Sequence, residues 1–231
     1  GRIVMEKGSL KFGGLEKFTK ELKTLNSLTI VGMGTARFTG LVGEYAFEEL
    51  ANLPTKVEYG SEFTYRDIAT PLKTGLLAIS QSGETADTLN AIKKAKKEKM
   101  LTLGIVNVIG SSITREVNAG IYNHVGPETA VASTKASTSQ VLLQIMLAIY
   151  LGRIRGLTKL RGQEILRDSK LSMGEVERLR QLVQNKQITL EQFEEMVGGW
   201  KPGMRVKFDI ALTQKNVKEI RRLLPEVPQE Y

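Results

Sequence analysis

The fold is decided by one short segment of the chain, Gly75-Leu76-Leu77-Ala78-Ile79-Ser80-Gln81-Ser82-Gly83-Glu84-Thr85. Its first five residues are apolar, which is typical of a strand covered on both faces of a parallel sheet. The other six carry hydroxyl groups and a glycine, and they lead into a stretch up to Lys99 whose apolar residues recur at helical spacing. A buried strand, a polar turn and a helix in this order form part of a parallel βαβ unit.

The same alternation continues on both sides of this segment. We expect further strands at residues 28–31, 55–59, 101–106 and 120–125, and helices over residues 41–52, 85–99 and 134–151. Strands that alternate with helices predict a parallel sheet connected by right-handed crossovers. The predicted fold class is therefore α/β, a three-layer domain with a five-stranded parallel sheet.

Composition divides the chain into three parts. We expect an N-terminal segment at residues 1–26, the sheet-bearing domain at residues 27–152 and a small, mostly helical C-terminal extension at residues 153–231. The extension has 16 Lys and Arg residues against 11 Asp and Glu, so it carries most of the net charge of +8. Capping boxes at Ser172–Glu175 and Thr189–Gln192 predict two of its helices.

Composition also excludes several kinds of site. The chain has no cysteine, which excludes a disulfide, a zinc–thiolate site, an iron–sulfur cluster and a cysteine nucleophile. The single histidine, His124, excludes a metal site built from several imidazoles. The longest apolar run, residues 141–151, is shorter than the roughly 20 residues that span a bilayer. We therefore expect no membrane association and, since disulfides are absent, a cytoplasmic protein.

Neither a cofactor nor a nucleic acid is expected as a ligand. The Gly32–Gly34 pair lacks the third glycine of a dinucleotide fingerprint, because Arg37 occupies that position. The glycine-rich loop ending in Lys-Ser/Thr, which cradles nucleotide phosphates, is also absent. The lysines of residues 93–99 fall on the polar side and at the end of a predicted helix, which indicates a solvated face.

The polar turn at residues 80–85 has the chemistry of an anion site. Open parallel sheets bind ligands beyond the carboxyl ends of their strands, where this turn is predicted to lie. The hydroxyl groups of Ser80, Ser82 and Thr85 and the unpaired N–H groups of a helix start suit a phosphate without any lysine. Gly83 permits the backbone to turn closely around the anion. The alternative is a Ser/Thr-rich helix cap that binds no ligand.

Two further turns favour the anion site over the simple cap. Gly34-Thr35-Ala36 follows the first strand of the domain, and Ala132-Ser133-Thr134-Lys135-Ala136 precedes its last helix. Both turns are predicted to lie at the same edge of the sheet as residues 80–85. Three hydroxyl-bearing turns at one edge predict an uncharged pocket that captures a phosphate dianion.

These turns resemble those of sugar isomerase (SIS) domains, and in particular the first isomerase domain of glucosamine-6-phosphate synthases. The likeness extends over residues 27–152 and is carried by short colinear motifs, namely Ser80–Thr88, Gly40–Gly43, Val57–Tyr59, Ser61–Phe63, Asn107-Val108, Gly110–Ser112 and Val131–Ala136. The resemblance implies a flavodoxin-like domain that binds fructose 6-phosphate or glucosamine 6-phosphate.

The resemblance also implies roles for individual residues. It places the phosphate on Ser80, Gln81, Ser82 and Thr85, and the sugar near Thr35, Val131 and Ser133. With Gly83 added, the expected substrate-binding residues are Thr35, Ser80, Gln81, Ser82, Gly83, Thr85, Val131 and Ser133. One position departs from the family, since Ala36 stands where a serine is frequent, and this departure removes one hydroxyl contact.

No catalytic residue is identified by the sequence, although three residues are candidates. His124 and Glu128 are four positions apart and close to the expected sugar, where a histidine and a carboxylate could move a proton between carbons 1 and 2. We favour a structural or subunit-contact role for His124, because the family's first domain has a similar histidine to which no chemistry is assigned. Lys135 could pair with the phosphate or equally with a structural carboxylate.

The family's complete synthases contain two parts that this chain lacks in recognisable form. One is a glutaminase domain with a cysteine nucleophile, so glutamine hydrolysis by this chain is excluded. The other is a second isomerase domain with the isomerising glutamate, and residues 153–231 do not resemble it. We therefore predict a sugar-phosphate-binding domain of a protein related to isomerizing glutamine–fructose-6-phosphate aminotransferase, in amino-sugar metabolism, forming a homodimer with sites between subunits.

Two alternatives stay open. The chain could be a stand-alone dimeric aldose–ketose isomerase, which would interconvert sugar phosphates by itself. It could also be a non-enzymatic sensor, in which sugar-phosphate binding alters how the basic extension contacts an acidic partner or nucleic acid. No recognised DNA-binding motif supports the second alternative.

Overall fold

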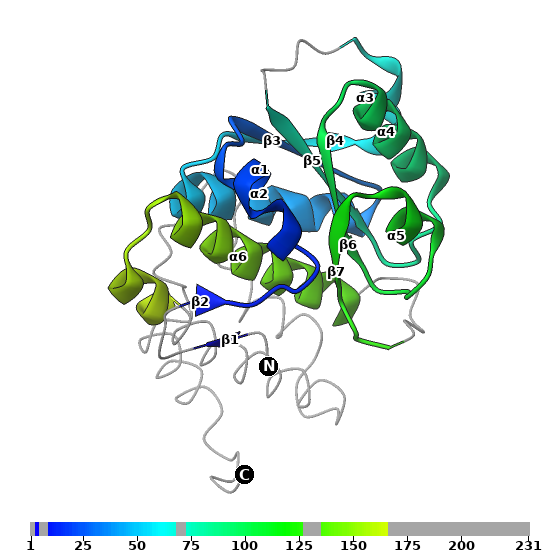
Figure 1. The fold of residues 1–231 in the computed structure, drawn as a ribbon. Coiled ribbons are helices and arrows are strands. Elements are labelled where there is room, and N and C mark those ends of the chain that lie inside the picture. Colours follow the sequence, from blue (N-terminus) through cyan, green and yellow to red (C-terminus); the bar gives the residue numbers. More distant parts are fainter. Residues whose placement is uncertain (1–2, 5–8, 68–72, 127–134, 166–231) are drawn as a thin grey trace, which may run out of the picture. The chain divides into compact units, whose positions relative to one another are not determined.

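The structure, a computed structural model, describes residues 3–4, 9–67, 73–126 and 135–165 (Figure 1). The backbone contacts divide the chain into two units, residues 1–163 and 164–231. Nearly all of the second unit lies outside the described residues. The helices predicted for the C-terminal extension therefore stay predictions, and the first unit contains the whole predicted sheet.

Five parallel strands form the central sheet, in the spatial order β4-β3-β5-β6-β7 (Figure 1). They are β3 (Ser27–Gly32), β4 (Thr55–Tyr59), β5 (Thr74–Ser80), β6 (Leu101–Val106) and β7 (Ala119–Tyr122). This order is that of flavodoxin-like folds, so the predicted α/β class and the five-stranded parallel sheet are confirmed. All of β5 is buried, as its apolar sequence predicts. A short antiparallel pair, β1 (Ile3–Val4) and β2 (Ser9–Leu10), precedes the sheet in the chain.

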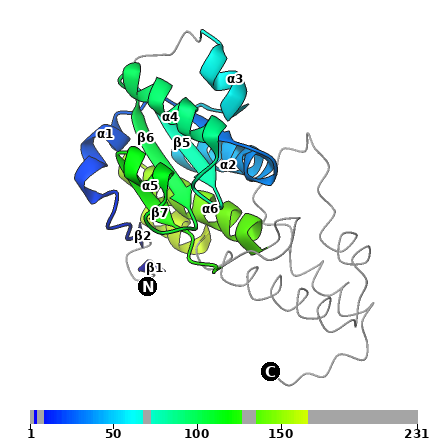
Figure 2. The ribbon, with the colours of Figure 1, turned by 90° about the vertical axis from the view of Figure 1, so that its right-hand side faces the viewer.

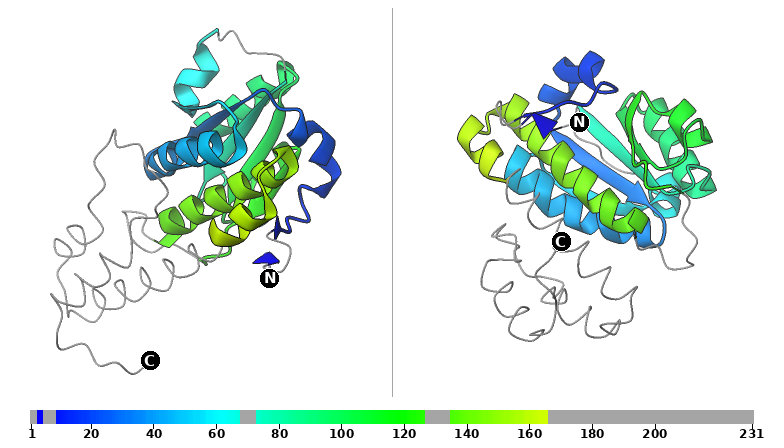
Figure 3. Two further views of the ribbon diagram at one scale, coloured as in Figure 1. Left: turned by 90° about the vertical axis from the view of Figure 1, so that its left-hand side faces the viewer. Right: turned by 90° about the horizontal axis from the view of Figure 1, so that it is seen from below.

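Helices cover both faces of the sheet (Figure 2; Figure 3). On one face, α2 (Thr35–Ala51) packs along α6 (Lys135–Arg155), and α1 (Thr19–Lys23) contacts α6. The other face carries α3 (Gly60–Tyr65), α4 (Ala86–Lys97) and α5 (Ser112–Glu116). The chain crosses the sheet in opposite directions from β3 to β4 and from β5 to β6. Right-handed crossovers therefore place α2 and α4 on opposite faces.

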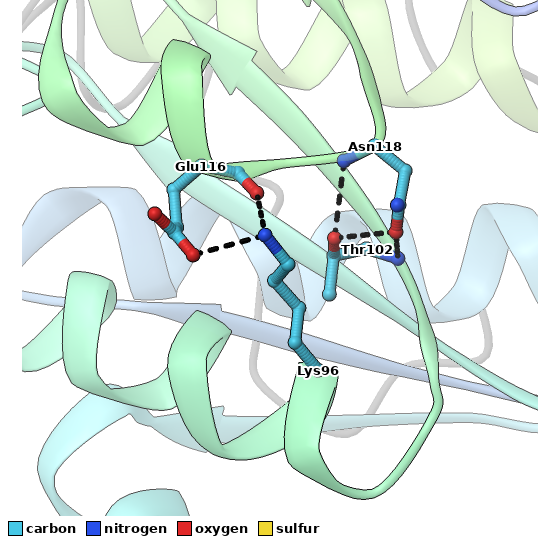
Figure 4. Close-up of polar contacts among 4 residues, drawn as sticks. All are labelled: Lys96, Thr102, Glu116 and Asn118. Atoms are coloured by element: carbon cyan, nitrogen blue, oxygen red, sulfur yellow. Dashed lines mark hydrogen bonds and ion pairs between the residues drawn. The ribbon is translucent and has the colours of Figure 1, made fainter.

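The amphipathic pattern of α4 gives it one buried and one solvated side. Ala91, Ile92 and Ala95 are completely buried in the core against β5. The lysines of residues 93–99 are mostly exposed, in agreement with the predicted solvated face. Lys96 additionally connects α4 to α5, because its Nζ lies 3.0 Å from both the carboxylate and the backbone carbonyl of Glu116 (Figure 4).

A second polar contact in the same region holds β7 beside β6. The side-chain oxygen of Asn118 accepts hydrogen bonds from the backbone N–H of Thr102 (2.9 Å) and from its hydroxyl (2.8 Å) (Figure 4). The Thr102 hydroxyl in turn accepts from the backbone N–H of Asn118 (3.1 Å). This reciprocal pairing satisfies buried polar groups at the point where β7 joins the sheet.

Several elements differ from the sequence prediction. The helix predicted at residues 41–52 begins at Thr35, because Gly34 adopts a φ of +53° and turns the chain directly from β3 into α2. The strand predicted at residues 120–125 is β7 and ends at Tyr122. The helices α3 and α5 were not predicted, since 6 and 5 residues are too few to show helical periodicity.

The early end of β7 has a specific cause in the side chain of Asn107. The last ladder bond runs from the backbone N–H of Asn123 to the carbonyl of Val106 (2.9 Å). Beyond it, the Asn107 side chain accepts from the backbone N–H of Val125 (3.0 Å) and donates to the carbonyl of Gly126 (2.7 Å). A side chain therefore takes the place of the strand partner, and the backbone leaves the β conformation at this point.

Gln144 is a polar residue buried completely between α2 and α6. Its Nε2 donates to the carbonyls of Thr39 (3.0 Å) and Gln140 (3.3 Å). A methyl group at the facing Gly43 would lie 1.9 Å from Gln144 Oε1, so the close approach of the two helices depends on that glycine. Gln144, a polar residue in the largely apolar helix α6, therefore takes a specific part in the packing of α6 on α2.

This packing predicts a coupled effect of two substitutions. Gly43→Ala should destabilise the fold by about 1–3 kcal/mol, because Gln144 must be displaced. In a Gln144→Ala background the same change should be neutral or stabilising by up to about 1 kcal/mol, because the space is free and alanine favours a helix more than glycine does. Urea denaturation of the four variants measures the coupling, and additive effects would contradict the packing described here.

Candidate functional site

Two helix N-termini meet at the carboxyl edge of the sheet. β3 leads through Gly34 into α2, and β5 leads through residues 81–85 into α4. The two strands are neighbours, with Val31 opposite Ala78, so both helices start at the same edge. The first N–H groups of a helix have no partner within it, and its N-terminus carries a partial positive charge. The edge therefore presents donors and positive potential without a cationic side chain.

A pocket of about 210 Å³ lies between these helix starts. It is lined by Met33, Thr35, Ala36, Ile79, Ser80, Gln81, Ser82, Thr85 and Gln140. Among the described residues that line it, none carries a charge. The structure therefore brings together five residues that the sequence assigned to substrate binding, namely Thr35, Ser80, Gln81, Ser82 and Thr85.

The nearest cation along α2 is engaged elsewhere. The guanidinium carbon of Arg37 lies 4.2 Å from the centre of the Tyr59 ring, at the end of β4. Such a cation–π contact holds the side chain over the aromatic face. Arg37 does not line the pocket, so the pocket keeps the uncharged character that the sequence predicts.

The hydroxyl groups of Ser80, Ser82 and Thr85 make hydrogen bonds within their own loop. Ser80 is buried, and its Oγ accepts from the backbone N–H of Gly83 (3.0 Å) and lies 3.2 Å from Thr85 Oγ1. A hydroxyl group accepts two hydrogen bonds and donates one. When Ser80 accepts from both Gly83 and Thr85, its own proton stays free for a ligand. Ser82 is exposed, and its Oγ accepts from the backbone N–H of Glu84 (3.2 Å), which also leaves its proton free.

Gly83 determines the shape of the loop but does not line the pocket. Its φ is +69°, and a methyl group at this position would lie 2.0 Å from Ser111 Oγ. Its carbonyl accepts from the backbone N–H of Ile113 (2.9 Å). Both the conformation and the lack of space require glycine here. The expected part of Gly83 in substrate binding stays a prediction.

Glu84 anchors the same loop to α5. Its carboxylate accepts from the backbone N–H of Ser112 (2.7 Å), the first residue of that helix. Hydrogen bonds from Ser112, together with the nearby Arg115, hold the pKa of Glu84 below its ordinary value of 4.5. The loop is therefore held between the start of its own helix and the start of α5.

The remaining expected site residues are not among the described residues that line the pocket. Val131 and Ser133, expected near the sugar, and Glu128, a catalytic candidate, lie outside the described residues. Lys135 is the first residue of α6, half-buried, and does not line the pocket. Their proposed roles stay predictions.

His124 is exposed and lies two residues beyond the end of β7, with a φ of +56°. Its ring centre is 5.7 Å from that of Tyr122, and it does not line the pocket. The strand predicted at residues 120–125 would have included His124, but β7 ends before it. Neither the catalytic nor the subunit-contact role is tested by this position.

Sequence reasoning missed Gln140. It lies in α6, and it is almost completely buried although it lines the pocket. The available signal was a pair of glutamines, Gln140 and Gln144, four positions apart in a largely apolar helix. That spacing places both on one helix face, but the sequence does not show what the face contacts.

The described ranges contain no group of three or more His, Cys, Asp or Glu side chains that could hold a metal ion. Within the same part of the chain, no helix has both the length and the apolar character needed to cross a membrane.

Comparison with known proteins gives a consistent set of relatives. The SIS domain family matches residues 21–150. The chain is 44% identical over 159 residues to a glutamine–fructose-6-phosphate aminotransferase (isomerizing) of Chlorobaculum tepidum, covering 69% of this chain and 26% of the relative. The corresponding protein of Thermus thermophilus is 40% identical over 171 residues, covering 74% and 28%. The chain thus spans about a quarter of the length of these relatives.

The solved structures agree with this relationship. The C-terminal domain of glucosamine-fructose-6-phosphate aminotransferase from Francisella tularensis superimposes with a TM-score of 0.73 at 28% identity. The match covers 80% of this chain and 51% of that domain.

The anchoring of the loop by Glu84 predicts a pH-dependent stability difference. A carboxylate with a lowered pKa stabilises the fold above its ordinary pKa of 4.5, and this contribution is lost as the pH falls through the lowered value. Glu84→Gln should therefore reduce stability at pH 7, and the difference from the unaltered chain should shrink towards pH 3. Denaturation at both pH values measures it.

A matched control for this experiment is Glu21→Gln, at an exposed position of α1. This variant should show no comparable difference at pH 7. A Glu84→Gln effect of the same size at pH 3 and pH 7 would show that the carboxylate charge does not anchor the loop.

Proposed function

The chain belongs to the SIS domain family, and from this premise we propose that it binds a hexose 6-phosphate, either fructose 6-phosphate or glucosamine 6-phosphate. The phosphate is held by the hydroxyl groups of Ser80, Ser82 and Thr85 and by the free N–H groups at the start of α4. The observation that carries the proposal is the pocket itself, where these hydroxyls and two helix N-termini face one uncharged space.

The electrostatics of the pocket support an anionic ligand. A dianion gains from the positive ends of α2 and α4 and from charge-assisted hydrogen bonds, which are shorter and stronger than neutral ones. The donors are fixed before binding, because Gly83 and Glu84 hold the loop against α5. Little side-chain entropy is therefore lost when the ligand binds.

The sugar is proposed to lie on the side of the pocket formed by the start of α2, next to Thr35. Val131 and Ser133 complete that side in the proposal. Ala36 lines the pocket without a hydroxyl group, so this chain offers one polar contact fewer there than a serine would. The names of the relatives include fructose 6-phosphate, and this agrees with a hexose phosphate as the ligand.

The proposed cellular role is that of the sugar-phosphate-binding part of a protein related to glucosamine-6-phosphate synthase. The chain has no cysteine, so we propose no glutaminase activity for it. Amino-sugar metabolism, a cytoplasmic location and a homodimer belong to the same proposal.

The proposal predicts phosphate-dependent binding that depends on Ser82. Isothermal titration calorimetry should detect binding of fructose 6-phosphate or glucosamine 6-phosphate to the chain. It should detect no binding of free fructose. Ser82→Ala removes one charge-assisted hydrogen bond, which costs roughly 1.5–3 kcal/mol, or about 10- to 150-fold in Kd.

A suitable control is Ser61→Ala in α3, which does not line the pocket. It should leave the affinity unchanged. The proposal fails if neither hexose phosphate binds, or if Ser82→Ala and Ser61→Ala bind as tightly as the unaltered chain.

A further inference from the structure

Gln140 is a buried amide with an unused donor group. Only 2% of the residue is exposed, and it lines the pocket from the second turn of α6. Its Oε1 lies 3.5 Å from the hydroxyl of Thr39, which donates to it. Among the described residues, its Nε2 donates to no protein acceptor. Because the residue lines the pocket, a ligand in the pocket can accept a hydrogen bond from this amide.

Gln140 lies on the α2 side of the pocket, away from the loop of residues 80–85. Thr39 is one turn along α2 from Thr35 and Ala36. Its single hydroxyl proton is shared between the Ala36 carbonyl (2.8 Å) and, more weakly, Gln140 Oε1 (3.5 Å). The amide of Gln140 is therefore attached to the α2 side. The hydroxyls proposed to hold the phosphate come instead from the loop between β5 and α4.

We propose that Gln140 is a specificity residue that donates a hydrogen bond from Nε2 to an oxygen of the sugar. The inference rests on the proposed function, since it requires a hexose phosphate whose phosphate occupies the loop at residues 80–85. A sugar offers hydroxyl and carbonyl oxygens as acceptors, and a neutral amide binds them without adding charge beside the phosphate. Thr39 is its positioning residue in this proposal, because its hydroxyl contacts the amide oxygen.

The experiment compares two ligands that share a phosphate, fructose 6-phosphate and inorganic phosphate. Gln140→Met keeps the length and flexibility of the side chain and removes the donor. Titrations followed by ³¹P NMR should show fructose 6-phosphate weakened by roughly 2- to 12-fold, the range expected for one neutral hydrogen bond. The affinity for inorganic phosphate should stay within about 1.5-fold, because the hydroxyl loop is unchanged.

Two further variants separate a contact with the sugar from a general packing effect. Thr39→Val should lower the preference for fructose 6-phosphate in the same direction but by less, since it frees the amide without removing it. Gln144→Met alters the same α2–α6 interface outside the pocket lining, and it should leave the ratio of the two affinities unchanged. If Gln140→Met does not fold, Thr39→Val alone decides the question.

The inference is overturned if Gln140→Met and Thr39→Val leave the ratio of the two affinities as it is in the unaltered chain. This includes the case in which both ligands weaken equally. That result would leave the proposed function intact, because fructose 6-phosphate would still bind through its phosphate. If the unaltered chain binds neither ligand, the proposed function and this inference both fail.

Discussion

The parallel pairing of β3 with β5 is the constraint on which the candidate site depends. Parallel neighbours end at the same edge, so the helices that follow them, α2 and α4, start side by side. Each start contributes unpaired N–H groups and a partial positive charge. The positive potential from these helix starts thus arises from the backbone, and this contribution does not depend on lysine or arginine side chains.

The surroundings of the pocket explain how donors at that edge are kept in place. Gly83 fits against Ser111 only because it has no side chain, and Glu84 joins the loop to the start of α5. On the other side, Gln144 fills the space that Gly43 leaves between α2 and α6. Glycines therefore mark the points of closest packing, and polar side chains connect the helices across them. A rigid wall of this kind suits a site whose selectivity rests on the placement of neutral donors.

Local sequence predicted the parts of the structure that depend on local patterns. The apolar run of residues 75–79 and the hydroxyl-rich turn after it predicted the central strand and the loop of the pocket, and the alternation of elements predicted the parallel sheet. Features set by distant contacts were missed. β7 ends early because Asn107 binds the following backbone, and α2 starts early because Gly34 adopts a left-handed conformation. Gln140 was missed because its contact with Thr39 joins residues 101 positions apart.

The central claim is that neutral hydroxyl and backbone donors, without a lysine or arginine, hold a phosphate at this edge. A crystal structure of the chain with fructose 6-phosphate tests it most directly. The account predicts phosphate oxygens within about 2.5–3.2 Å of the Ser80, Ser82 and Thr85 hydroxyls and of N–H groups at the start of α4. A phosphate bound by Arg37, by Lys135 or by any other cationic side chain, or located away from the pocket, would contradict it.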